Sequence, residues 1–122
     1  MKIKESAENY LETILMLSKE KNHVRSIDVA NELGFSKASV SVAMKSFREE
    51  GYVITDTDGG ISLTEKGLQI AEKVCERHDV IAKALIALGV SEDVAYADSC
   101  KIEHDISQES FEKIKKFLES RG

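Results

Sequence analysis

Proline and tryptophan are absent from this 122-residue sequence, and only 6% of its residues are aromatic. Glutamate, lysine, alanine, leucine and isoleucine are common instead, which favours a mainly helical fold. No apolar run approaches the roughly 18 residues that a membrane-spanning helix needs. The N-terminus lacks the apolar core of a signal peptide. A chain of this length buries a modest core, so we expect one domain, or one small domain with a helical extension.

Cysteine is also scarce, because only Cys75 and Cys100 are present and they lie far apart in the sequence. Two cysteines without a secretion signal are typical of a reducing compartment and argue against a disulfide framework. We therefore expect a cytoplasmic protein.

Basic residues are outnumbered by acidic ones, 17 to 22, and the net charge is −5. This total argues against a simple nucleic-acid-binding protein, but the charges are unevenly distributed. Every charged residue between positions 34 and 48 is basic, whereas acidic residues gather in the last third of the chain. The asymmetry suits a molecule with a nucleic-acid-binding end and a metal-binding or regulatory end, although an ordinary solvated surface is compatible with it as well.

Apolar residues recur three and four positions apart in the first half of the chain, which predicts amphipathic helices over residues 6–19, 26–33 and 36–50. Ser26 and Ser36 stand at positions typical of N-caps. Gly34 and Gly51 stand where glycine commonly ends a helix. A short helix, a tight turn and a longer helix together indicate a helix-turn-helix.

A glycine-rich turn follows, flanked by β-branched residues at 52–54 and 61–63, which predicts a β-hairpin. A helix-turn-helix followed at once by a hairpin is a winged helix. Asp56 and Asp58 make the hairpin tip acidic, so we expect it to contribute little to phosphate binding. Thr64 is the expected N-cap of a long helix, and a last amphipathic helix starts at residue 107.

The third helix carries the features of a DNA-reading helix. Its N-terminal half has small polar side chains, and in a helix-turn-helix this end enters the major groove. Lysine and arginine would anchor phosphates without reading sequence. The candidate DNA contacts are Ser26, Ser36, Lys37, Ala38, Ser39, Ser41, Lys45 and Arg48. The alternatives are that the serines only cap or cover an exposed helix, or that the winged helix docks a protein.

Cys100, Glu103 and His104 are spaced i, i+3 and i+4, which places them on one face of a helix predicted over residues 91–106. A thiol, a carboxylate and an imidazole are costly to bury unpaired but are good ligands for a transition metal. The same predicted stripe includes Val94 and Ala97.

His78 lies on the apolar stripe of an earlier helix, together with Ala71, Val74, Ile81 and Leu85. Two metal-competent helical faces in one small protein indicate a metal site between helices. The alternative is that these are packed core residues, since a lone buried histidine or cysteine is more often structural than a ligand.

The chain resembles the metal-dependent repressors typified by the diphtheria toxin repressor and the manganese transport regulator, over nearly all of its length. The segments that carry the resemblance are residues 8–14, 36–41 and 63–67, the pair Arg77-His78, and residues 100–104. The resemblance implies a mainly α fold of the short, two-domain type, which lacks a C-terminal β-domain. A winged-helix DNA-binding domain (residues 1–71) is followed by an all-helical metal-binding and dimerisation domain (residues 72–122).

The resemblance also implies a set of metal ligands. Cys100 occupies a position that is glutamate in the manganese-type branch and cysteine in the iron-type branch. Asn9 stands where aspartate or methionine is expected, and its carbonyl is an uncharged, weaker ligand. The remaining positions match ligands of the manganese-type branch. The implied ligands are Asn9, Glu12, His78, Cys100, Glu103 and His104.

Thiolate and imidazole favour Fe(II), Co(II) or Zn(II), whereas carboxylate and carbonyl oxygens suit Mn(II). Cys100 therefore places Fe(II) first and Mn(II) second, with Zn(II) or Co(II) possible in vitro. The resemblance implies that the metal acts as a corepressor, ordering a homodimer that binds double-stranded operator DNA. We expect dimerisation through residues 85–88 and 107–118, and neither a membrane nor a small organic substrate as a partner.

Two other functions are compatible with these residues. One is a metal-independent winged-helix regulator, which chelator-insensitive DNA binding would support. The other is a small metal-dependent hydrolase, since glutamate and histidine beside a metal can activate water. The sequence has no H-E-x-x-H motif, nucleophile elbow or phosphate loop, so we predict that the protein is not an enzyme.

Overall fold

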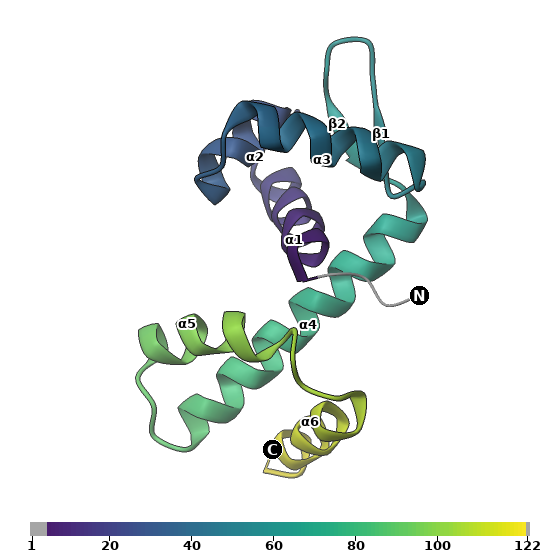
Figure 1. The fold of residues 1–122 in the computed structure, drawn as a ribbon. Helices are drawn as coiled ribbons and strands as arrows, with labels where there is room; N and C mark the ends of the chain where they lie inside the picture. Colours follow the sequence, from purple (N-terminus) through teal and green to yellow (C-terminus); the bar gives the residue numbers. More distant parts are fainter. Residues whose placement is uncertain (1–4, 122) are drawn as a thin grey trace. The chain divides into compact units, whose positions relative to one another are not determined.

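A computed structural model describes residues 5–121 of the chain (Figure 1). Within that range it contains six helices and one two-stranded antiparallel sheet. The elements are α1 (Glu5–Glu20), α2 (Ser26–Leu33), α3 (Lys37–Glu49), β1 (Val53–Thr55), β2 (Ile61–Leu63), α4 (Glu65–Ala87), α5 (Glu92–Ile102) and α6 (Gln108–Arg121). The predicted mainly helical fold with an N-terminal winged helix is confirmed.

The chain divides into two compact units, residues 1–72 and 73–122, and the division falls within α4. We call them the winged-helix unit and the helical unit. Compact units are defined by packing rather than by function, so the functional boundary expected after residue 71 stays a prediction.

The winged-helix unit is built around α1, whose apolar stripe is buried as the sequence pattern predicted. Leu11 and Ile14 have no exposed surface. α1 packs against α2 and β2, and α2 packs against α3. α3 contributes Val40 and Met44 to this core, so one side of α3 is committed to packing.

Caps at the helix ends explain where α2 and α3 begin and stop. The backbone N–H of Ser39 donates to Ser36 Oγ (3.1 Å), which confirms Ser36 as the N-cap of α3. Gly34 follows α2 with φ 72°, a left-handed conformation that glycine adopts without strain. The prediction for Ser26 was wrong, because it is the first residue of α2. The preceding N–H, of Arg25, donates to Asp28 Oδ2 at 2.9 Å, so a carboxylate within the first turn caps this helix.

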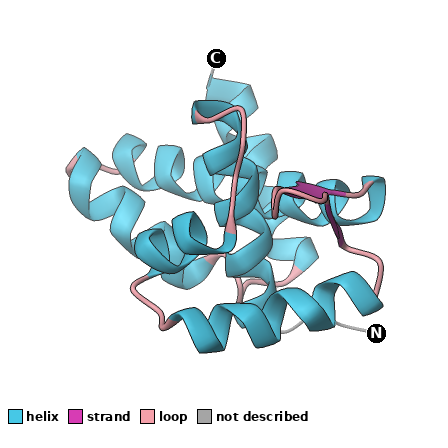
Figure 2. Ribbon diagram, turned by 90° about the horizontal axis from the view of Figure 1, so that it is seen from above, coloured by secondary structure: helices cyan, strands magenta, loops and turns pink. Residues whose placement is uncertain are grey.

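The wing is the antiparallel pair of β1 and β2, drawn in magenta in Figure 2, and Val53 lies opposite Leu63. Its turn is closed by Asp56, whose Oδ1 accepts the backbone N–H groups of Asp58 (2.9 Å) and Gly60 (2.8 Å). The Gly60 hydrogen bond, followed by that of Asp58 and the nearby His23 and Arg25, lowers the pKa of Asp56 below its usual value. The acidic tip therefore includes a carboxylate that shapes the turn.

The start of α4 is fixed against the wing. The Gly67 N–H donates to Thr64 Oγ1 at 3.1 Å, which confirms Thr64 as the cap of this helix. The Thr64 hydroxyl in turn donates to the Gly51 carbonyl at 2.6 Å. Gly67 faces the Tyr52 carbonyl so closely that a Cβ atom would collide with it. Glycine is therefore required here by space rather than by φ.

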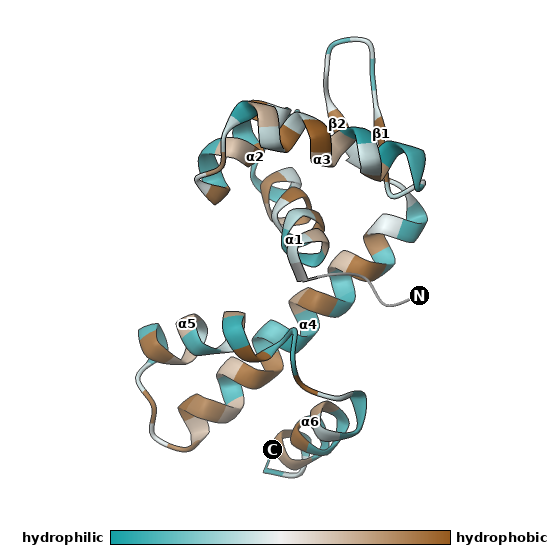
Figure 3. Ribbon diagram, in the orientation of Figure 1, coloured by the Kyte–Doolittle hydropathy of each residue, from teal (hydrophilic) through white to brown (hydrophobic). Residues whose placement is uncertain are grey.

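The helical unit consists of the remainder of α4 with α5 and α6, and its buried residues include Ile81, Ala95 and Phe111. Figure 3 shows apolar and hydrophilic segments alternating along α4 and α6, as amphipathic helices require. No helix in the part of the chain that the structure describes is both long enough and apolar enough to cross a membrane.

α5 is shorter than the pattern predicted, since it ends at Ile102 instead of continuing to residue 106. The N–H groups of Asp105 and Ile106 both donate to the Ile102 carbonyl, which forms a turn. The predicted stripe was also wrong in part: Val94 is 50% exposed and Ala97 is exposed as well. The buried face instead carries the side chains at 95, 99 and 103, because polar contacts to His78 on α4 turn that face inward.

Candidate metal centre

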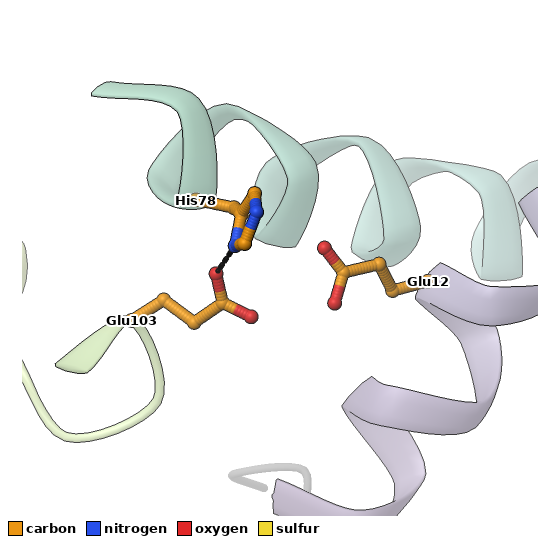
Figure 4. A group of neighbouring side chains, drawn as sticks. All are labelled: Glu12, His78 and Glu103. Carbon is orange, nitrogen blue, oxygen red and sulfur yellow. Dashed lines mark hydrogen bonds and ion pairs between the residues drawn. The ribbon is translucent and has the colours of Figure 1, made fainter. Parts of the chain in front are cut away.

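Glu103 lies between two imidazole groups in the helical unit. Its Oε2 is 2.9 Å from Nδ1 of His78, and its Oε1 is 3.3 Å from Nε2 of His104. Figure 4 shows the first of these contacts, between α4 and the turn that follows α5. Glu103 follows directly after α5 but keeps helical dihedral angles (φ −57°, ψ −28°), so the predicted spacing still directs it toward His78.

Two further side chains face the same ring nitrogen of His78. Ser99 Oγ is 3.1 Å from Nδ1, and Cys100 Sγ is 3.5 Å from it. The Ser99 hydroxyl donates to the Tyr96 carbonyl (2.9 Å), so Nδ1 acts as the donor toward Ser99 and Glu103. Sequence reasoning identified Cys100 and missed Ser99. The signal for Ser99 was available, since it stands four residues before Glu103 on the same face.

Arg77 holds the segment that carries Glu103. Its Nη1 donates to the carbonyls of Glu103 (3.1 Å) and Ile106 (2.9 Å), and its Nη2 donates to Gln108 Oε1 (2.8 Å). The guanidinium also lies 5.4 Å from the centroid of the Phe111 ring. Arg77 therefore joins α4 to the connection between α5 and α6, and it fixes the backbone from which Glu103 projects.

The burial of these groups suits a cation. The side chains of Glu103 and His104 are each 1% exposed, and that of His78 is 20% exposed. A buried carboxylate is costly unless a positive charge or hydrogen bonds compensate it. Imidazole, carboxylate and thiolate are all ligands of divalent transition metals, so the residues present fit such an ion. Cys100 differs from its neighbours in being exposed, which leaves this side of the centre open to solvent.

Asn9 and Glu12 belong to the winged-helix unit, where both are half-buried on α1. They are three residues apart, so they share one face of that helix. Their part in metal binding stays a prediction.

The candidate DNA contacts are gathered mainly on the outer side of α3. Lys37, Lys45 and Arg48 are exposed there, as expected for side chains that meet phosphates. Arg48 Nη1 also donates to Thr55 Oγ1 at 3.3 Å, which ties α3 to the wing. Among the small residues, Ser36, Ala38, Ser39 and Ser41 are exposed, and Ser26 on α2 is half-buried.

Comparison with known families assigns both halves of the chain. Residues 2–61 match the family described as iron dependent repressor, N-terminal DNA binding domain. Residues 64–121 match the iron dependent repressor, metal binding and dimerisation domain. The chain belongs to the iron-dependent repressor family. The resemblance predicted from the sequence is thereby confirmed.

Individual relatives agree with this assignment. An uncharacterized HTH-type transcriptional regulator of Methanocaldococcus jannaschii is 36% identical over 117 residues, which cover 94% of each chain. The HTH-type transcriptional regulator MntR of Bacillus subtilis is 34% identical over 109 residues, covering 89% of this chain and 77% of MntR. The solved structure of the manganese regulator SloR matches with a TM-score of 0.80 at 28% identity. This chain is 93% covered by that match but spans only 53% of the SloR chain.

Membership of the family has direct consequences. Its members are metal-dependent, DNA-binding transcriptional regulators rather than enzymes. A DNA-binding domain joined to a metal-binding and dimerisation domain supports DNA, a divalent metal ion and a second copy of the chain as partners.

Proposed function

We propose that this chain is a cytoplasmic repressor of metal-ion homeostasis genes, in which a divalent transition metal is the corepressor for operator binding. The observation that carries the proposal is Glu103, a carboxylate buried between His78 and His104 in the half of the chain that matches a metal-binding domain. When bound, a divalent cation would place a positive charge beside this buried carboxylate and its neighbouring imidazoles.

The proposed ligands in the helical unit are His78, Cys100, Glu103 and His104. The contacts of His78 and His104 with Glu103 and of Cys100 with His78 support this set. We propose that Asn9 and Glu12 complete the set with oxygen ligands. Their support is the resemblance of residues 8–14 to family members and their common face on α1.

Fe(II) is the proposed physiological metal, with Mn(II) as the second choice and Zn(II) or Co(II) as metals that occupy the site in vitro. The support is chemical, because a thiolate beside imidazole is softer than an all-oxygen site and favours metals later than manganese. The exposed position of Cys100 allows its replacement without disturbing the core, so this preference can be tested directly.

Dimerisation is proposed through the apolar groove of the helical unit. This groove has a volume of about 390 Å³ and is lined by Ile81, Ala84, Leu85, Leu88, Ile102, Lys113, Ile114 and Phe117. Leu88 is 77% exposed and Phe117 is 54% exposed, although both are large and apolar. Exposed apolar surface of this kind marks an interface, and the family description names dimerisation for this half of the chain.

The test compares the wild-type chain with Glu103→Gln and with the matched control Glu109→Gln, an exposed residue on α6. Each protein is titrated anaerobically with Fe(II), Mn(II) and Zn(II). Binding to DNA selected from a random pool is then measured with the metal and with a chelator. We expect saturable metal binding and chelator-sensitive DNA binding from the wild type and from Glu109→Gln, and the loss of both from Glu103→Gln.

Either of two results would contradict the proposal. In one, Glu103→Gln binds metal as tightly as the wild type. In the other, the wild-type chain binds its selected DNA equally well in the presence of chelator. Because glutamine preserves the volume of glutamate, circular dichroism of Glu103→Gln separates loss of a ligand from loss of the fold. Cys100→Ala is a second variant, at an exposed position.

A further inference from the structure

Val42 lies on α3, the helix labelled in Figure 1, and the fold leaves its apolar side chain uncovered. It is 71% exposed, more than any other large apolar side chain that the structure describes in the winged-helix unit. Valine also lowers helix propensity relative to alanine, because its branched Cβ restricts the side chain against the preceding turn. An exposed valine in the middle of a helix therefore contributes nothing to the core and disfavours the helix slightly.

The position of Val42 follows from the helical period. Successive residues of an α-helix are rotated by about 100°, so residues two apart lie on nearly opposite sides. Val42 is two residues from Val40 and two from Met44, which are 0% and 1% exposed. It therefore projects directly away from the core of the winged-helix unit. Ala38 lies one turn earlier on the same outward face and is exposed as well.

The surroundings of Val42 identify the surface as one that meets DNA. Lys37 and Lys45 are exposed on the outer side of α3, and Lys45 is one turn beyond Val42. α3 is the second helix of the helix-turn-helix, the element that lies in the major groove in proteins of this kind. Lys45 shares the face of Val42 and can engage a phosphate, which leaves the apolar side chain of Val42 directed toward the bases. Glu49, also exposed on this face, is the last residue of α3, two turns beyond Val42.

The hydroxyl groups at the start of α3 are partly committed to the helix cap. Ser36 Oγ accepts the Ser39 N–H at 3.1 Å and donates to Ser39 Oγ at 2.9 Å. The methyl groups of Ala38 and Val42 take no part in the helix cap and are exposed in the described part of the winged-helix unit. The apolar group that B-DNA presents in its major groove is the 5-methyl group of thymine.

We propose that Val42 is a specificity-determining residue that reads a thymine 5-methyl group in each operator half-site, with Ala38 beside it. This inference rests on the proposed function, because it requires that α3 binds DNA. It assigns a base preference to a position that carries no hydrogen-bonding group. The contact buries about one methyl group, which corresponds to about a fourfold change in affinity.

The first experiment selects binding sites from random double-stranded DNA with the full-length, metal-loaded chain. Wild type, Val42→Ala, Val42→Thr and the control Val94→Ala are compared. Val94 is an exposed valine on α5, outside the winged-helix unit. We expect the wild type and Val94→Ala to prefer thymine, by about fourfold, at one position of each half-site. Val42→Ala should accept other bases there while keeping the rest of the site, whereas Val42→Thr keeps one γ-methyl group and should retain part of the preference.

The second experiment replaces each thymine of the selected site by deoxyuridine, which removes only the 5-methyl group. At one position per half-site the wild-type Kd should rise about fourfold, whereas the Kd of Val42→Ala should change by less than twofold. The inference is overturned if no single replacement weakens the wild type, or if it weakens Val42→Ala equally. The inference is also overturned if the selected sequences of the wild type and Val42→Ala are identical.

These results are distinguishable from a failure of the proposed function. If the metal-loaded wild type enriches no sequence at all, both the proposed function and this inference fail. If it enriches one sequence and Val42→Ala enriches the same one, only the inference fails. Alanine has the higher helix propensity, so loss of folding is not expected in Val42→Ala, and Val42→Thr keeps the branched shape as a second check.

Discussion

Replacement of Arg77 by lysine measures how strongly the guanidinium fixes the segment that carries Glu103. Two of its hydrogen bonds, to the carbonyls of Glu103 and Ile106, are partly shielded from water. A hydrogen bond from a charged donor contributes about 1.5–3 kcal/mol. Lysine keeps the charge but has a single side-chain nitrogen, so it can make only some of the hydrogen bonds that the guanidinium makes. We expect Arg77→Lys to lower the free energy of unfolding by about 2 kcal/mol.

That loss corresponds to a decrease of roughly 6–10 °C in Tm for a chain of this size. The assay is thermal and urea unfolding with chelator present, followed by circular dichroism. The control is Arg121→Lys on α6, where the guanidinium is exposed and lies 5.6 Å from the Phe117 ring centroid. It should shift Tm by less than about 2 °C, because an exposed cation–π contact contributes little.

The same substitution should weaken metal binding by about tenfold, as expected when a residue that orients a ligand is changed. A metal titration of Arg77→Lys at a temperature below its transition checks this. If Arg77→Lys melts with the wild type, the guanidinium does not hold the turn after α5, and the argument from its hydrogen bonds is refuted. If it melts earlier but binds metal normally, the bonds stabilise the unit without positioning Glu103.

Three other predictions address separate features. Cys100→Glu should shift the preference from Fe(II) toward Mn(II), since oxygen replaces sulfur, and an unchanged ratio of the two affinities would contradict the ligand argument. Gly67→Ala should destabilise the chain by about 1–3 kcal/mol because its Cβ meets the Tyr52 carbonyl, and urea unfolding equal to wild type would oppose this. The lowered pKa of Asp56 stabilises the fold above pH 3.8, and this contribution disappears as pH falls through the lower, folded-state value. The free energy of unfolding of Asp56→Asn should therefore fall less steeply with decreasing pH than that of the wild type. Identical acid transitions would show that the turn hydrogen bonds do not contribute to stability.

Much of the fold was predictable because the sequence pattern is strong in the first half of the chain. The α1 stripe, the Ser36 and Thr64 caps and the glycine after α2 are local signals, and the structure confirms them. Ser26 was assigned wrongly as an N-cap because serine is a common cap, whereas Asp28 supplies the accepting carboxylate from inside the helix. Local propensity does not distinguish these two ways of satisfying the same N–H group.

The candidate metal centre was only partly predictable, for a different reason. Cys100, Glu103 and His104 were recognisable from their chemistry and spacing. The contact of Glu103 with His78 joins residues far apart in the sequence, and its contact with His104 lies beyond the end of α5, so helical spacing predicts neither contact. The role of Arg77 in holding the turn after α5 was not predicted, because its carbonyl partners are backbone groups that no side-chain pattern reveals. The exposed Val94 was predicted to be buried because apolar spacing alone cannot show that polar contacts orient α5.

The connection before α2 also touches the wing, because the Ile61 N–H donates to the Val24 carbonyl at 2.7 Å. An open strand edge is a template on which other chains can add strands and aggregate. At Ile61 this edge is already occupied by the protein's own backbone. The opposite edge belongs to β1, which is three residues long and has the Arg48 guanidinium bonded to Thr55. A short edge with a charge beside it disfavours strand addition. The wing therefore offers neighbouring chains little on which intermolecular sheet could grow.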